Sequence, residues 1–212
     1  PDAFWAKPSI WSALYRKDFL SSNNISFLPT PGASFQDTSF TFKVLACAQR
    51  AMYSGKAFLH YRQDNEHSSV NNPGKVFCVC DEHHEMSRFL NEDRPDLKPA
   101  LDPIRAKVKF YNYDWNLNRL APELRRDFIS VFSNEMAEEL QVNNIICAEA
   151  PFDRYGFNPG EFARVKDFAE NADLLKVQYS LTGSGKLNTI CEYFAAGGFS
   201  MVARMMKRKL RR

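Results

Sequence analysis

A long amphipathic segment in the second half of the chain constrains its fold more than any other feature. The segment "APELRRDFISVFSNEMAEELQ" spans residues 121–141, and its apolar residues recur every three or four positions. They are Leu124, Phe128, Ile129, Val131, Phe132, Met136 and Leu140. This period predicts an amphipathic α-helix whose apolar face is buried against other elements. A helical pattern over 104–120 and weaker ones near 161–176 and 187–211 predict a mainly helical second half.

The first half of the chain has a mixed pattern. Apolar spacing predicts a helix over 7–24 and a second helix starting at Asp37. The face of the second helix is expected to consist of Phe40, Val44, Leu45, Ala48 and Met52. "KAFLHYR" (56–62) is short, apolar and bounded by turn formers, so it predicts a strand, and a polar loop follows at 63–75. Residues 76–92 are expected to form a strand or an irregular entry into a helix.

Composition is that of a folded globular protein and argues against nucleic acid as a partner. Hydrophobic residues make up 44% of the 212 residues and charged residues 25%, while the net charge is only +3. The surplus lies in "RMMKRKLRR" (204–212), which carries six Lys/Arg. We therefore expect no nucleic acid, and we expect that the tail could contact an anionic membrane surface.

Five cysteines, an odd number, and the lack of a secretory signal favour a reducing compartment, so a cytoplasmic location is expected. No apolar run reaches the roughly 20 residues that span a bilayer. Any membrane association would accordingly be peripheral, at the inner face of the cell membrane.

Asp37, in "GASFQDTSFTFKV" (32–44), permits two interpretations. As an N-cap, its carboxylate would accept hydrogen bonds from the free N–H groups of the first turn. As a general base at a cleft, it would remove a proton from a hydroxyl group. The local sequence leaves both open, and the N-cap is the more common use of such a residue.

The stretch "HYRQDNEHSSV" (60–70) is a second candidate for a binding site. Arg62 ends the predicted strand, and His67 and Ser69 lie in the loop after it, where α/β folds place binding groups. Arginine suits a diphosphate or a carboxylate, and histidine can donate to the same oxyanion. An exposed polar loop is the alternative.

Three other stretches are less informative. "CVCDEHHE" (78–85) lacks the second ligand pair of a structural zinc site, and "TGSGK" (182–186) lacks the full phosphate-loop pattern and is interpreted as a turn. The aromatic residues of 110–115 are explained by a helix–helix contact or, alternatively, by a platform for stacking sugar rings.

Three pieces in sequence order resemble a known family: "PSIWSALYRKDFL", "ISFLPTPGASFQDTSF" and "AFLHYRQDNEHSSV". Together they resemble the acceptor-side half of a family 2 glycosyltransferase of the GT-A fold, the bacterial type that builds or decorates cell-surface polysaccharides. The resemblance covers about residues 5–90. Gln36 stands where the family usually has Glu, and the chain contains none of the family's Asp-x-Asp metal motifs.

The resemblance implies roles for particular residues. Asp37 would be the catalytic base of an inverting, metal-dependent transfer of a sugar, of the hexosyltransferase class, from a nucleotide-sugar donor to a glycan acceptor. Gln36, Arg62, His67, Ser69 and Trp11 would contact the donor diphosphate or the acceptor. A divalent cation, Mn²⁺ or Mg²⁺, would be held mostly by residues outside this chain, and no metal ligand is assigned within it.

The expected fold is therefore α/β: a partial GT-A-like half domain at residues 1–92, followed by a mainly helical extension at 104–212. Since the chain begins at Pro1 and lacks the nucleotide-binding half, it is expected to be a fragment that is inactive alone. The alternative is a non-catalytic helical module for protein interaction or membrane docking, in which Asp37 is only a helix cap.

Overall fold

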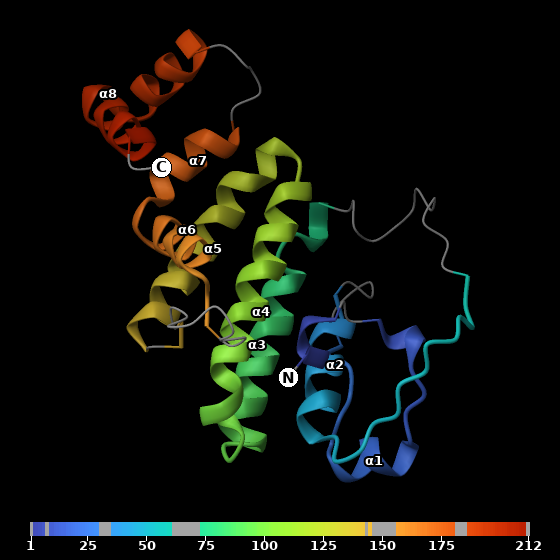
Figure 1. Ribbon diagram of the computed structural model, residues 1–212. Coiled ribbons are helices and arrows are strands. Elements are labelled where there is room, and N and C mark those ends of the chain that lie inside the picture. The colour runs from blue at the N-terminus through green and yellow to red at the C-terminus, as the bar shows by residue number, and fades with distance from the viewer. Residues whose placement is uncertain are drawn as a thin grey trace. The chain divides into compact units, whose positions relative to one another are not determined.

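The computed structural model describes residues 2–6, 9–29, 35–60, 73–142, 144–145, 156–180 and 186–210 (Figure 1). The chain divides into two compact units, Pro1–Asn112 and Tyr113–Arg212. The boundary falls inside a single long helix, α4 (Lys98–Arg119), so each unit contains part of it.

The first unit consists of short helices and three-residue to five-residue helical turns before α4. In chain order they are η1 (Asp2–Trp5), η2 (Ile10–Ser12), α1 (Lys17–Ser22), α2 (Asp37–Cys47), η4 (Pro73–Lys75), α3 (Cys78–Arg88) and the π-helical η5 (Phe89–Asp93). Helix α2 packs against α3. Their shared core contains Phe42, Met86, Phe89 and Leu90, all almost completely buried, with Phe4 of η1 against it.

The helix predicted over 7–24 is shorter in the structure. Only Lys17–Ser22 is α-helical, and its end is set by local chemistry. Asn24 adopts a left-handed conformation (φ 52°), and the Ile25 N–H donates to Leu20 O at 2.9 Å. This arrangement is the Schellman motif, which satisfies the last carbonyl groups of a helix and turns the chain away.

The predicted α/β class is wrong, because none of the described residues forms a strand. The described part of the segment predicted as a strand, 56–60, has no regular structure, and Phe58 is 80% exposed. A strand needs a neighbour for its N–H and C=O groups, and no described segment supplies one. Residues 76–92, for which a strand was one expectation, mostly form α3 and η5.

In its described residues, the second unit is helical, as the apolar spacing predicts. It contains the end of α4, α5 (Pro122–Gln141), α6 (Pro159–Glu170), α7 (Ala172–Ser180) and α8 (Lys186–Leu210). Helix α5, predicted over 121–141, packs against α6 and α7, and α7 packs against α8. Aromatic rings join these helices: Phe132 stacks on Phe168 with ring centroids 4.1 Å apart, and Tyr113 meets Phe132 edge-on at 5.3 Å.

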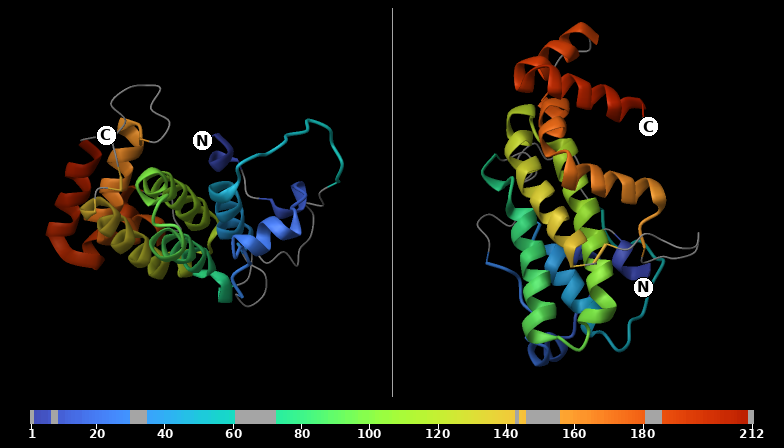
Figure 2. Two further views of the ribbon diagram at one scale, coloured as in Figure 1. Left: turned by 90° about the horizontal axis from the view of Figure 1, so that it is seen from below. Right: turned by 90° about the vertical axis from the view of Figure 1, so that its left-hand side faces the viewer.

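Helix α8 consists of two arms that meet at a kink, as Figures 1 and 2 show. The backbone is non-helical at Gly197 and Gly198, and Gly198 has φ 63° and ψ −155°. This combination is accessible essentially only to glycine, because any other residue would carry a Cβ atom into the backbone. Beyond the kink the helix continues to Leu210.

No helix in the described ranges is both long enough and apolar enough to cross a bilayer.

Candidate functional site

Asp37 is the first residue of α2, and the N-cap position before it belongs to Gln36. The Gln36 side chain does not cap the helix; its Nε2 instead donates to Leu28 O at 2.9 Å. Phe35, just before it, has φ 62°, a left-handed conformation that is rare for a bulky side chain. Such backbone outliers occur preferentially at functional sites, where the surrounding structure compensates for their strain.

The first turn of α2 is capped from another helix. If Asp37 were an N-cap, its carboxylate would accept the N–H of Ser39 or of Phe40, two or three residues on. In the structure the Ser39 N–H donates instead to Glu82 Oε2 of α3, at 3.1 Å. The side chain that caps this N–H group is therefore that of Glu82.

Glu82 is fully buried, and its Oε1 has no hydrogen-bond partner within the described part of the protein. Burial raises the pKa of the Glu82 carboxyl group above its ordinary value, because the charged form loses its hydration. The bond from Ser39 and the charge of Lys43 partly oppose this shift, whereas the charge of Asp37 adds to it. The bond to the Ser39 N–H places Glu82 beside the first turn of α2, the turn in which Asp37 lies.

A buried ion pair lies beneath the same turn. Lys43 Nζ contacts Glu85 Oε1 at 2.9 Å, and the two side chains are only 4% and 11% exposed. Lys43 also donates to Ser26 O at 2.9 Å, while Arg88 donates to both oxygens of Glu85. Chiefly because of the hydrogen bonds from Arg88, the pKa of Glu85 lies below its ordinary value. This network holds α2, α3 and the segment around Ser26 together.

Tyr15 completes the surroundings of Asp37. Burial raises the pKa of the Tyr15 phenol, and the charge of Asp37 raises it further. The Tyr15 ring packs edge-on against Phe40 with centroids 5.2 Å apart, and Phe27 stacks on Phe40 at 4.1 Å. The neutral phenol is therefore the stable form beside the Asp37 carboxylate.

The other predicted site residues are only partly described. Trp11 lies on η2 and is 46% exposed. Arg62, His67 and Ser69 lie outside the described residues. The structure thus brings Asp37 together with Glu82 and Tyr15, which the sequence did not single out.

A sequence signal for Glu82 and Lys43 exists in retrospect. Lys43 stands between Phe42 and Val44 in an apolar helix, and Glu82 follows the apolar run of 76–80. A charged residue at a position expected to be buried needs a partner, so each predicts a polar contact on another element.

The described residues contain no group of three or more His, Cys, Asp or Glu positioned to hold a metal ion. Among the described residues, the carboxylates near Asp37 are therefore not arranged as such a group.

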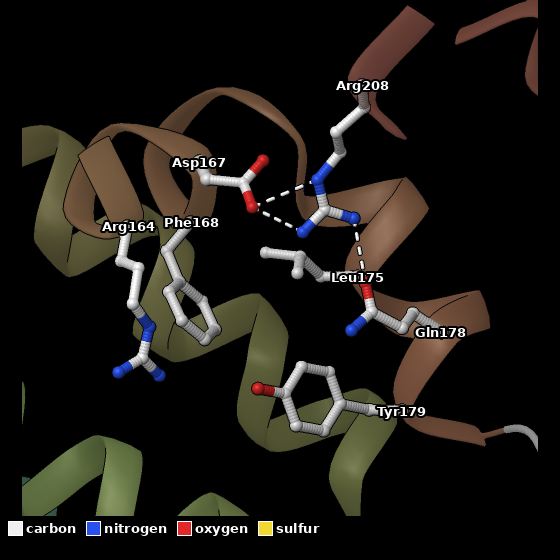
Figure 3. A pocket seen from close by; sticks show the side chains of 7 residues that line it. All are labelled: Arg164, Asp167, Phe168, Leu175, Gln178, Tyr179 and Arg208. Carbon is white, nitrogen blue, oxygen red and sulfur yellow. Dashed lines mark hydrogen bonds and ion pairs between the residues drawn. The ribbon is translucent and has the colours of Figure 1, made fainter. Parts of the chain in front are cut away.

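The second unit contains a small cavity of about 210 Å³ (Figure 3). It is lined by Arg164, Asp167, Phe168, Leu175, Gln178, Tyr179 and Arg208. Arg208 of α8 donates to Asp167 of α6 and, at 2.8 Å, to Gln178 of α7. Arg164 is paired with Asp114 at 2.5 Å. Both cations already have carboxylate partners, so the cavity is a structural junction of three helices.

No family model, curated protein or solved structure matches this chain.

Proposed function

We propose that this chain contributes the acceptor side of an inverting glycosyltransferase in which Asp37 is the general base. The observation that supports the proposal is the bond from the Ser39 N–H to Glu82, because the carboxylate that accepts this first-turn N–H belongs to another helix. The sequence resemblance around Asp37 supplies the reaction class. The proposal does not include an α/β sheet, which the described residues lack.

The proposed reaction is a single displacement. Asp37 accepts the proton of an acceptor hydroxyl group as the hydroxyl oxygen forms a bond to the anomeric carbon of the donor. The bond from that carbon to the diphosphate oxygen breaks at the same time, and its electron pair leaves with the nucleoside diphosphate. The configuration at the anomeric carbon is inverted.

The chain's other residues would support this step by position. Gln36, anchored on Leu28 O, fixes the backbone that presents Asp37. Trp11 would contact the sugar, and Arg62, His67 and Ser69 would contact the diphosphate or the acceptor. The cation that the resemblance implies would supply positive charge for the leaving diphosphate when bound.

The test is Asp37→Asn in the complete protein, with release of nucleoside diphosphate measured over a panel of sugar nucleotides. Loss of a general base is expected to lower kcat by about 10²–10⁴-fold. Asp18→Asn is the matched control, because Asp18 also lies in the first turn of a helix, α1, and is exposed. Asp18→Asn is expected to leave turnover unchanged.

Urea denaturation of both variants separates catalysis from stability. A first-turn acid contributes only about 0.3–1 kcal/mol through the helix dipole, so Asp37→Asn is expected to remain folded. A folded Asp37→Asn protein with unchanged turnover would show that Asp37 is not the base.

A non-catalytic interaction module is the second candidate function. It is favoured by the all-helical architecture of the described residues and by the exposed apolar side chains of α8. Failure to release nucleoside diphosphate from any donor, by complete and folded protein, would favour this candidate.

A further inference from the structure

The second arm of α8 has two opposite apolar faces, and other residues that the structure describes cover one of them. The covered face packs Met205, with Met201 beside it, against Leu174 of α7 and Tyr193 of the first arm. The Tyr193 hydroxyl donates to Leu174 O at 3.2 Å. These contacts fix the rotation of the arm about its own axis.

The other face is an exposed apolar stripe, which consists of Phe199, Ala203, Met206 and Leu210. At 3.6 residues per turn, the spacing of 4, 3 and 4 places these side chains within about 60° of one another and opposite Met201 and Met205. Phe199 is 82% exposed, Met206 50% and Leu210 88%. The kink at Gly198 places Phe199 at the start of the stripe. The ring centroids of Phe199 and Phe194 are 5.0 Å apart.

Positive charges border the stripe on both sides. By the same helical geometry, Lys207 lies along one edge with Arg204 beyond it, and Lys209 lies along the other edge. All three are exposed. Residues 199–210 contain no acidic residue. Arg208, the remaining cation, points to the covered side and is bonded to Asp167.

We propose that this stripe docks on the surface of an anionic bilayer. A helix lies in a membrane interface when a narrow apolar face is bordered by Lys and Arg, because the apolar side chains enter the acyl boundary while the cations contact lipid phosphates. A bilayer offers negative charge on both sides of the stripe at once. The long stems of Lys207 and Lys209 allow their ammonium groups to reach the headgroups.

Docking of this kind goes beyond sugar transfer and does not depend on it. It would hold the protein at the membrane surface and keep Gly198 at the protein–lipid boundary. One amphipathic arm gives reversible binding, because its buried area is small compared with that of a spanning helix.

Flotation of the purified protein with vesicles tests the proposal. The vesicles are made of phosphatidylcholine alone or of equal amounts of phosphatidylcholine and phosphatidylglycerol. Wild-type protein is expected to float with the anionic vesicles, to bind the neutral vesicles at least about tenfold less, and to be released by high salt.

Two variants act on the stripe and its border. The first carries Phe199→Ser, Met206→Ser and Leu210→Ser; the second carries Lys207→Glu and Lys209→Glu. Each is expected to reduce binding to anionic vesicles by about tenfold or more. Because the altered side chains are exposed, circular dichroism and the thermal midpoint should match wild type, and Leu210→Ser alone provides a milder variant.

Matched controls lie in the first unit. Met52→Ser removes an apolar side chain that is 96% exposed, and Arg50→Glu with Lys56→Glu changes net charge as much as the double variant on α8. Both controls are expected to bind like wild type, as is Asp37→Asn.

Three results would overturn the proposal. The first is an absence of binding to anionic vesicles, and the second is equal binding by wild type and the triple serine variant. The third is concentration-dependent self-association in sedimentation that the triple variant abolishes, which would assign the stripe to contact between protein molecules.

Discussion

At the scale of single residues, the burial of Glu82 has a measurable consequence. Its carboxyl group has a raised pKa in the folded protein, chiefly because of burial. Between the unfolded pKa and this raised value the folded protein binds more protons than the unfolded chain does. Glu82 therefore contributes full stability below its unfolded pKa, and this contribution is lost as the pH rises through the folded value.

Glu82→Gln is expected to remove this pH dependence. A Gln side chain stays neutral, and its carbonyl oxygen can still accept the Ser39 N–H. Relative to wild type, the variant should gain unfolding free energy as the pH rises above the unfolded pKa of Glu82, because the wild-type contribution is lost there. Urea denaturation at several pH values measures the gain. Glu123→Gln, at an exposed position in α5, is the control; equal pH profiles for both variants would contradict the buried placement of Glu82.

The sequence located Asp37 at the start of a helix but could not decide between cap and base. The carboxylate that accepts an N–H of this first turn is that of Glu82, which is 43 residues from Ser39 in the chain. A short stretch of sequence around Asp37 contains the donor, Ser39, but not the acceptor, Glu82. The partners of a buried polar group are set by tertiary packing, which no single-sequence period records.

At the scale of secondary-structure elements, the kink of α8 depends on one glycine. An added Cβ at Gly198 would meet no atom within 4 Å, so space does not explain the requirement. The backbone itself does, because φ 63° with ψ −155° is strongly unfavourable for any residue with a Cβ.

Gly198→Ala is therefore expected to lower the free energy of unfolding by about 1–3 kcal/mol. Gly55→Ala is the control, since Gly55 is exposed and an added Cβ there also meets nothing within 4 Å. The control should stay within about 0.5 kcal/mol of wild type by urea denaturation. If Gly198→Ala were as stable as the control, the two arms of α8 would not need the left-handed residue.

Helices with a long, regular apolar period could be predicted from the sequence, and the short apolar run could not. The period over 121–141 matches α5 within a residue at its start, where Pro122 occupies the first helical position. In contrast, "KAFLHYR" offers too few residues to distinguish a strand from an exposed connection, and in the described part Phe58 and Leu59 stay exposed. The predicted face of α2 was also partly wrong, because Met52 lies beyond the helix end at Cys47 and is 96% exposed.

At the scale of the whole molecule, each unit has its own buried cluster. In the first unit it includes Phe42 and Phe89, and in the second Phe132 and Phe168. Parts of a protein with different local stability can open separately in hydrogen exchange. The α/β prediction failed at this scale, because it depended on a strand assignment at 56–62 and on a family resemblance, neither of which reports how α2 and α3 pack.

Lys43→Met tests the first unit selectively. It leaves the buried Glu85 without one of its two cationic partners and Ser26 O without a donor, which is expected to cost about 2–3 kcal/mol. Hydrogen exchange should speed up in α2 and α3, with α5 as the internal reference. The control is Arg16→Met. Because the ion pair of Arg16 with Asp18 is exposed, its loss is expected to leave exchange in α2 and α3 unchanged. Equal exchange in the two variants would contradict the role of Lys43.

Because α4 belongs to both units, the chain cannot be divided at their boundary without cutting this helix. A truncation at Asn112 would sever its turns and leave Phe110 of one piece and Tyr113 of the other, both fully buried here, beside a frayed end. We accordingly expect insertions within α4 to disrupt the folding of both units.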